Sequence, residues 1–137
     1  MYSTIMIPVD LAHTGQMAKS LSVAAALAKQ FGSKAHMVGV TLASPTAIAR
    51  TPGVFAGKLT AFAAEQSAAL GTVFEAHTEI SHDPAIDIDD VLMRAAKAIG
   101  ADLIVMASHV PGFAEHLFAS RAGYLAAHAP LSVFVVR

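Results

Sequence analysis

The chain has 137 residues, and we expect them to form one domain (residues 1–137) with a substantial core. The absence of cysteine excludes disulfide bonds and thiolate metal sites. The net charge is -1 and the basic residues are scattered singly, so we expect no nucleic-acid partner. No apolar run approaches the roughly 18 residues that span a bilayer, and the first residues do not resemble a signal peptide. We therefore expect a cytoplasmic protein with no membrane partner.

The chain begins with an apolar run over residues 5–9 that is typical of a buried parallel strand. Pro8 has no amide donor, so we expect it at a strand end or beside an open position. A helix is predicted next, with Thr14 as its N-cap and Gly32 as its C-terminal cap. Its apolar face is formed by Met17, Leu21, Ala24, Ala28 and Phe31.

A second strand is predicted over residues 35–42, and the prolines and glycines of residues 43–57 indicate a loop or a broken helix. A second helix follows and ends at Gly71, and residues 73–80 form a third strand. The third helix begins at Asp83 and Pro84 and ends at Gly100. Its apolar stripe is formed by Ile88, Val91, Leu92, Ala95, Ala96 and Ile99.

The last third of the chain is predicted to hold a strongly apolar strand over residues 102–106, a helix over residues 120–127 and a strand over residues 133–136. The alternation of strands and helices indicates an α/β fold, a parallel sheet with helices on both faces. In such sheets ligands bind beyond the carboxyl ends of the strands, where the strand order reverses. We expect the reversal between the first strand and residues 102–106. The residues just past those strand ends are Asp10, His13, Ala107, Ser108 and His109.

Two polar positions near this edge have both a binding and a structural interpretation. Asp10 is able to accept hydrogen bonds from an adenine or a ribose, or else to cap the turn that follows it. Ser120 is predicted at a helix start, where its hydroxyl and the amides after it suit a phosphate, although an ordinary N-cap has the same form. Arg121 would add charge to such a site, or lie in solvent as an ordinary helix residue.

The sequence gives no support for metal or nucleophilic chemistry. The seven histidines are scattered, and none has the helical spacing of a metalloprotease site. Ser108 and His109 are neighbours whose side chains point to opposite faces of a strand, so they do not form a catalytic pair. Phosphate-loop, dinucleotide-binding and nucleophile-elbow motifs are absent from the sequence. We expect no catalytic residue and no metal site.

Four segments together resemble the universal stress protein family over nearly the whole chain. They are residues 5–10, 83–85, 100–109 and 128–136, in the order and spacing of the family. The resemblance implies a Rossmann-like, adenine nucleotide α-hydrolase-like fold, a five-stranded parallel sheet with strand order 3-2-1-4-5. It also implies a candidate nucleotide pocket formed by Asp10, Val40, Ala107, Ser108, His109, Gly112, Ser120 and Arg121.

The chain departs from the family's nucleotide-binding motif, Gly-x2-Gly-x9-Gly-[Ser/Thr]. Its glycines are replaced by Ala107, Val110 and Ala119, the spacing is one residue shorter, and only Ser120 is retained. A Cβ at these places opposes close approach of a phosphate, and β-branched Val110 disfavours positive φ. Gly112 substitutes in part, but Pro111 beside it has no amide donor.

The resemblance therefore favours a non-enzymatic stress-response or regulatory module with a degenerate nucleotide site. The alternative is a family member that binds ATP or AMP with slow hydrolysis. A third hypothesis, an unrelated flavodoxin-like receiver or redox module, is disfavoured because only Asp10 follows the first strand, where a receiver has an acidic cluster for magnesium.

The resemblance further implies a homodimer built through residues 131–136, from Leu131 to Val136. This segment is apolar and ends the chain, and an exposed edge strand of this kind favours aggregation unless it is paired. Pairing across a twofold axis would continue the sheet and remove the edge. The hydrophobic content of 55% with 14% charged residues agrees with a covered surface.

Overall fold

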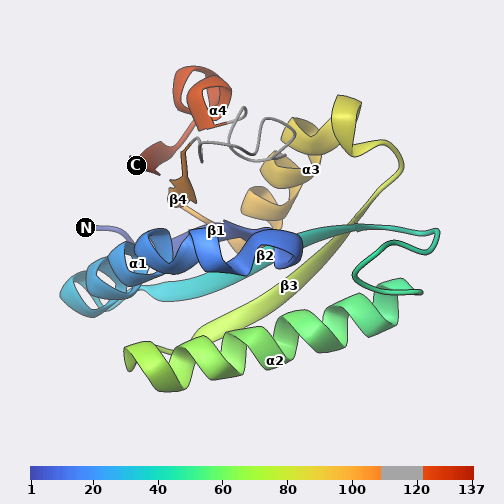
Figure 1. The fold of residues 1–137 in the computed structure, drawn as a ribbon. Coiled ribbons are helices and arrows are strands. Elements are labelled where there is room, and N and C mark those ends of the chain that lie inside the picture. The colour runs from blue at the N-terminus through green and yellow to red at the C-terminus, as the bar shows by residue number, and fades with distance from the viewer. Residues whose placement is uncertain (109–121) are drawn as a thin grey trace.

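The computed structural model describes residues 1–108 and 122–137, which form a five-stranded parallel sheet with helices on both faces (Figure 1). The strand order is β3-β2-β1-β4-β5, so the predicted fold class and the order 3-2-1-4-5 are confirmed. The strands are β1 (Thr4–Val9), β2 (Lys34–Leu42), β3 (Phe74–Ser81), β4 (Leu103–Ala107) and β5 (Ser132–Val136). All ladders are parallel, so the carboxyl ends of the strands lie at one edge.

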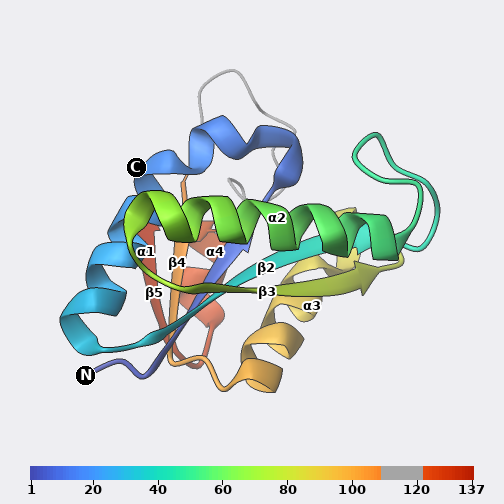
Figure 2. The ribbon, with the colours of Figure 1, turned by 90° about the horizontal axis from the view of Figure 1, so that it is seen from below.

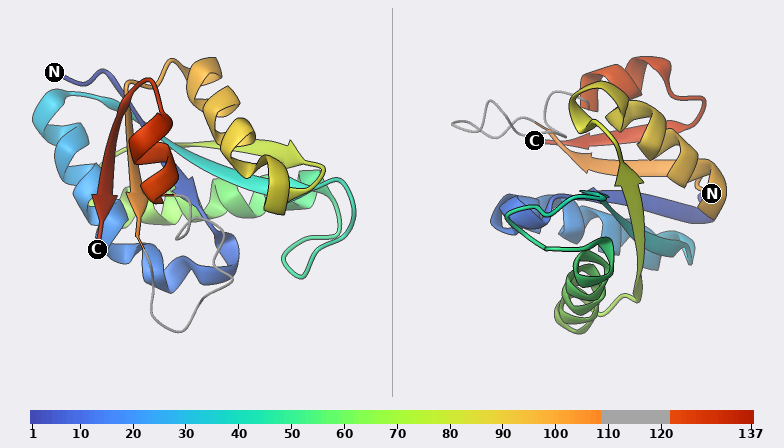
Figure 3. Two further views of the ribbon diagram at one scale, coloured as in Figure 1. Left: turned by 90° about the horizontal axis from the view of Figure 1, so that it is seen from above. Right: turned by 90° about the vertical axis from the view of Figure 1, so that its right-hand side faces the viewer.

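Helices cover the sheet in two layers, one on each face (Figure 2 and Figure 3). Helices α1 (Ala18–Phe31) and α2 (Pro52–Leu70) pack on one face, and α3 (Pro84–Ile99) and α4 (Ala122–His128) on the other. Within the described residues, no helix combines the length and the apolarity that crossing a membrane requires.

The apolar run of β1 is buried from Thr4 to Val9 because both of its faces meet a helical layer. Ile5 and Ile7 belong to the core under α1 and α2, whereas Met6 belongs to the core under α3 and α4. The alternation of side chains along a strand thus divides one continuous apolar segment between two cores.

Several helix ends have the capping residues that the sequence predicts. Asp83 caps α3, accepting a hydrogen bond from the Ala85 amide at 3.2 Å, and Pro84 occupies the first turn as predicted. Gly32, Gly71 and Gly100 end α1, α2 and α3 in the left-handed conformation, with φ between 64° and 70°.

Two predicted helix starts are wrong. Thr14 does not cap the first helix, because it lies inside a short 3-10 helix, η1 (Leu11–Met17), whose N-cap is Asp10. Helix α1 begins only at Ala18. The segment predicted as a loop or broken helix up to residue 57 becomes helical at Pro52. Thr51 supplies the cap there, because its hydroxyl accepts a hydrogen bond from the Val54 amide at 3.2 Å.

Strand β1 pairs unequally with its two neighbours. Its ladder with β2 continues to the end of the strand, at Val9. Its ladder with β4 consists of two register pairs, Ile5 with Leu103 and Met6 with Ile104. The strand order reverses at β1, so the two strands part at the place where the sequence predicts a ligand crevice.

Pro8 explains where the β1–β4 ladder stops. The Thr4 carbonyl accepts a hydrogen bond from the Asp102 amide at 3.0 Å, so the backbone of Thr4 faces β4. Backbone groups alternate between the two neighbours along a strand, so Pro8, four residues on, also faces β4. Proline has no N–H to donate, and the ladder ends before it. The expectation that Pro8 lies beside an open position is confirmed.

Replacing Gly39 by alanine is expected to destabilise the protein. A Cβ there would lie 2.7 Å from Cε1 of Phe55 and 3.0 Å from Cδ2 of Leu59, both buried side chains of α2. Overpacking of this kind costs about 1–3 kcal/mol of unfolding free energy, measurable by urea denaturation. Gly57→Ala is the matched control: nothing lies within 4 Å of its added methyl, and losing a helical glycine should stabilise by up to about 1 kcal/mol. Equal stability of Gly39→Ala and the wild type would contradict the close-packing argument.

Asp102 is expected to make the stability fall in acid. Hydrogen bonds from the amides of Ser3 (2.9 Å) and Thr4 (3.0 Å) lower the pKa of its carboxyl below the ordinary value. Because the folded pKa is the lower one, this stabilisation is present above the unfolded pKa of about 3.9 and is lost as the pH falls through the folded pKa. Asp102→Asn should cost about 1 kcal/mol at pH 7 and weaken the pH dependence.

Urea denaturation at pH 7 and at pH 3 measures this effect of Asp102, with Glu65→Gln, at an exposed position of α2, as the control. If Asp102→Asn kept the wild-type pH dependence, the carboxylate would not be the link between the N-terminal segment and β4.

Candidate functional site

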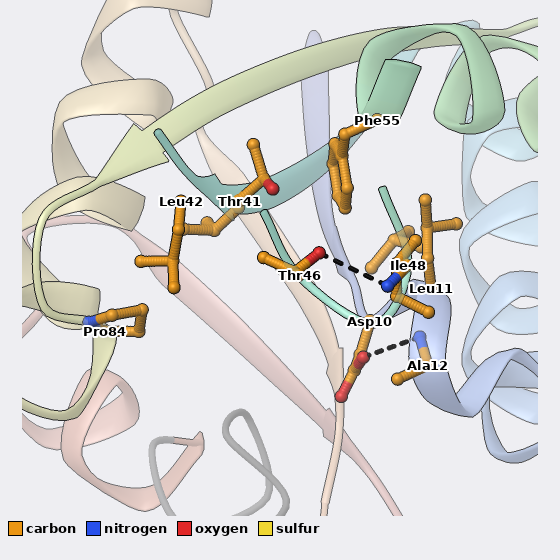
Figure 4. A pocket seen from close by; sticks show the side chains of 11 residues that line it. Asp10, Leu11, Ala12, Thr41, Leu42, Thr46, Ile48, Phe55 and Pro84 are labelled. Atoms are coloured by element: carbon orange, nitrogen blue, oxygen red, sulfur yellow. Dashed lines mark hydrogen bonds between the residues drawn. The ribbon is translucent and has the colours of Figure 1, made fainter. Parts of the chain in front are cut away.

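A hollow of about 240 Å³ opens at the carboxyl ends of β1 and β2, beside the point where β1 parts from β4 (Figure 4). Its walls come from both strand ends, the loop after β2, the first turns of α2 and the start of α3. The described lining residues are Val9, Asp10, Leu11, Ala12, Val40, Thr41, Leu42, Thr46, Ile48, Phe55 and Pro84. Most of these side chains are apolar, and Asp10 is the one that carries a charge.

Asp10 lies where β1 ends and η1 begins. Its Oδ1 accepts a hydrogen bond from the Ala12 amide at 2.9 Å, and its Oδ2 lies 3.0 Å from Nδ1 of His13. The structure thus shows the capping interaction that the sequence offered as the alternative to ligand binding. The side chain is 18% exposed, so part of the carboxylate remains accessible from outside the protein.

The loop between β2 and α2 folds back to form one wall of the hollow. The hydroxyl of Thr46 accepts hydrogen bonds from the amides of Ile48 (3.3 Å) and Ala49 (3.2 Å), and the Thr46 amide donates to the Ala49 carbonyl at 2.8 Å. Lys58 of α2 donates to the Ile48 carbonyl, and Ala49 is buried in the core. The wall is therefore joined to α2 through the Ile48 carbonyl and anchored in the core by Ala49.

Phe55 forms the deep apolar side of the hollow and is 4% exposed. It reaches this depth because Gly39 of β2 has no side chain, so the ring packs directly on the strand. In Figure 4 Phe55, Leu11 and Ile48 lie opposite Leu42 and Pro84, with Thr46 and Asp10 between them in the view. A flat apolar group with a hydrogen-bond donor at its edge matches this arrangement.

The predicted site residues divide into three groups. Asp10 and Val40 line the hollow. Ala107 and Ser108 do not line it: Ala107 is buried in the core under α1, and the Ser108 amide donates to the Val136 carbonyl at 2.7 Å. The amide of Ser108 is thus used within the sheet. The predicted residues His109, Gly112, Ser120 and Arg121, and with them Val110 and Ala119, lie outside the described residues.

Sequence analysis missed the wall residues Thr46, Ile48 and Phe55. The signal that could have found them is Thr51 followed by Pro52, a cap and a first-turn proline, which starts α2 early enough to bring Phe55 over the sheet. The rule that ligands bind beyond the carboxyl ends of strands also applies to β2, because β2 ends at the same edge as β1. The residues after β2 were therefore candidates as well.

A second set of polar side chains lies on the α3 face of β2 and β3, away from the residues that line the hollow. His36 lies 3.6 Å from Glu75, and Glu79 contacts both His77 and Arg94 at 3.1 Å. Burial acts to raise the pKa of Glu79, but the hydrogen bonds from His77 and Arg94 prevail and lower it. These contacts satisfy one another, and in the described part of the chain no three His, Asp or Glu side chains are placed to hold a metal ion.

A family model described as the universal stress protein family matches residues 1–137. The chain therefore belongs to the universal stress protein family, as its sequence motifs indicated.

Several solved structures of this family resemble the chain. A universal stress protein in complex with cAMP is 17% identical, with a TM-score of 0.70, and the match covers 99% of this chain and 97% of that one. A universal stress protein from Archaeoglobus fulgidus is 20% identical, with a TM-score of 0.70 and full coverage of both chains (100% and 100%). The structure of the universal stress protein from Archaeoglobus fulgidus in complex with dAMP is 20% identical, with a TM-score of 0.62, covering 99% of this chain and 98% of that one. At these identities the likeness supports the fold.

Proposed function

We propose that this protein is a non-enzymatic stress-response or regulatory module that binds the nucleoside part of an adenine nucleotide in the hollow at Asp10. The single observation that carries the proposal is the hollow itself: apolar walls with one carboxylate near the rim, at the strand ends of a nucleotide-binding fold. Two of the solved relatives hold cAMP and dAMP, which are both monophosphates.

The size of the hollow favours a nucleoside or a monophosphate over a triphosphate. Its volume of about 240 Å³ lies below the roughly 300–1,000 Å³ of pockets that enclose a drug-sized ligand. Phosphates would have to extend toward the segment after β4, where the family's glycines are replaced by Ala107, Val110 and Ala119. Such a site binds the base and the sugar through β1 and β2 and gains little from additional phosphates.

Thermal unfolding with adenosine, AMP and ATP–magnesium tests this proposal. At a hundredfold excess over its dissociation constant, a ligand raises the unfolding free energy by about 2.7 kcal/mol. We expect AMP to stabilise the protein and ATP to stabilise it no more than AMP does, with no release of phosphate from ATP above the buffer rate. Asp10→Ala should abolish most of the shift relative to its own ligand-free midpoint.

Glu65→Ala, at an exposed position of α2, is the control variant and should keep the wild-type shift. A much larger shift with ATP than with AMP would support the alternative, a site that holds the triphosphate. No shift with any of the three ligands would remove nucleotide binding from the proposal.

We further propose that the module is a homodimer joined through β5. This strand is the last of the sheet, pairs with β4 on one side, and includes Phe134, which is 45% exposed. Its half-buried residues Val133 and Val135 lie on the opposite face of the strand and pack against the core under α3 and α4, so the edge of β5 carries apolar side chains on both faces. A second copy paired along this edge would cover it and extend the sheet.

Light scattering at micromolar concentration is expected to give the mass of a dimer. Phe134→Asp should raise the dimer dissociation constant at least about tenfold, because a charge would then have to be desolvated at the interface. Ile86→Asp alters another exposed apolar side chain, on α3, and should leave the mass unchanged. A monomeric wild type would contradict the dimer.

A further inference from the structure

The carboxylate of Asp10 is held from two sides by the turn that follows β1. Its Oδ1 accepts a hydrogen bond from the Ala12 amide at 2.9 Å, and its Oδ2 lies 3.0 Å from Nδ1 of His13. The backbone closes the same turn, because the His13 amide donates to the Asp10 carbonyl at 3.0 Å. A single residue, His13, therefore contacts Asp10 through both its main chain and its side chain.

The backbone of His13 departs from the geometry of the helix that contains it. With φ of -137° and ψ of 44°, it interrupts the 3-10 helix η1. The imidazole is 30% exposed and faces back toward Asp10. The kink at His13 and its side-chain contact with Asp10 therefore occur at the same residue.

We propose that His13 is a positioning residue for the ligand pocket: it fixes the Asp10 carboxylate in the orientation that receives a hydrogen-bond donor from the bound nucleoside. The inference rests on the proposed function, since it concerns the same pocket. The terminal torsion of an aspartate is broad, so contacts at both oxygens, from the Ala12 amide and from His13, restrict the orientation of the carboxylate more than one contact does. Holding the second oxygen reduces the ordering that the ligand would otherwise have to impose.

The proposal distinguishes a role in binding from a role in folding. A histidine that only stabilised the turn would lower the unfolding free energy when removed, but would not change affinity in a protein that remains folded. A positioning residue changes affinity, and changes it only while Asp10 is present. The side chain of asparagine offers a second distinction, because its Nδ2 donor is able to take the place of Nδ1 of histidine.

The affinity for adenosine and AMP, measured by titration calorimetry at constant pH, provides the test. We expect His13→Ala to weaken binding about tenfold and His13→Asn to restore it to within about twofold of the wild type. In the Asp10→Ala background, His13→Ala should have no further effect. His128→Ala, which removes an exposed histidine of α4, is the control and should bind as the wild type does. Wild-type affinity in folded His13→Ala would overturn the proposal and leave the proposed function intact.

A second measurement needs no ligand and tests the contact between His13 and Asp10 on which the positioning role depends. The ¹⁵N chemical shift of His13 Nδ1 should change in Asp10→Ala, whereas that of His128 should not. A change of the shift together with nucleoside binding would support the proposal, whereas a wild type that binds no nucleoside would overturn both the proposed function and the positioning role. An unchanged His13 shift would overturn the positioning role.

Discussion

The parting of β1 from β4 is the constraint on which the architecture of the site depends. The two strands share two register pairs, whereas β1 and β2 stay paired to the end of β1. Pro8 faces β4 without a donor, and a ladder in a sheet interior cannot continue past such a residue. The last register pair between β1 and β4 is Met6 with Ile104, four residues before Asp10, and the chain turns into η1 directly after Asp10.

The residues on and after β2 supply the apolar enclosure that the opening between β1 and β4 does not provide. An opening at a strand end is filled by solvent unless apolar side chains enclose it. Here the absence of a side chain at Gly39 allows Phe55 to pack directly on β2. Hydrogen bonds of Lys58 and Thr46 hold the loop between β2 and α2 in place. For the proposed nucleoside site this enclosure implies selectivity, because a polar group brought in without a partner would be costly, whereas a hydrogen-bond donor directed at Asp10 would find an acceptor.

Much of the fold follows from local signals that agree with one another. The apolar run of β1, the stripe of α3 and the glycines that end three helices each predict the element that forms. The errors arise where two signals compete. Thr14 and Asp10 are both good caps, and Asp10 prevails because it lies directly at the strand end. Gly53 and Gly57 suggest a break, but Thr51 and Pro52 start a helix that tolerates both of them.

The candidate site was less accessible to sequence reasoning, and for a different reason. Asp10 follows a recognisable strand, and Val40 follows from the family resemblance, so both could be assigned before the structure. Ile48 and Phe55 reach the hollow only through tertiary contacts, with Lys58 and across Gly39, that have no counterpart in a local pattern.

The proposed nucleoside site and the altered glycine motif lie in different parts of the chain. The hollow described here is built from β1, β2 and the segments after them, while the altered glycine motif begins at the end of β4, on the other side of β1. Replacement of the glycines opposes close approach of a phosphate at the motif, whereas Phe55, Ile48 and Asp10 belong to the walls of the hollow. A chain with this arrangement is therefore able to lose recognition of the triphosphate while keeping a surface for the nucleoside. The absence of the motif by itself is then weak evidence against a ligand.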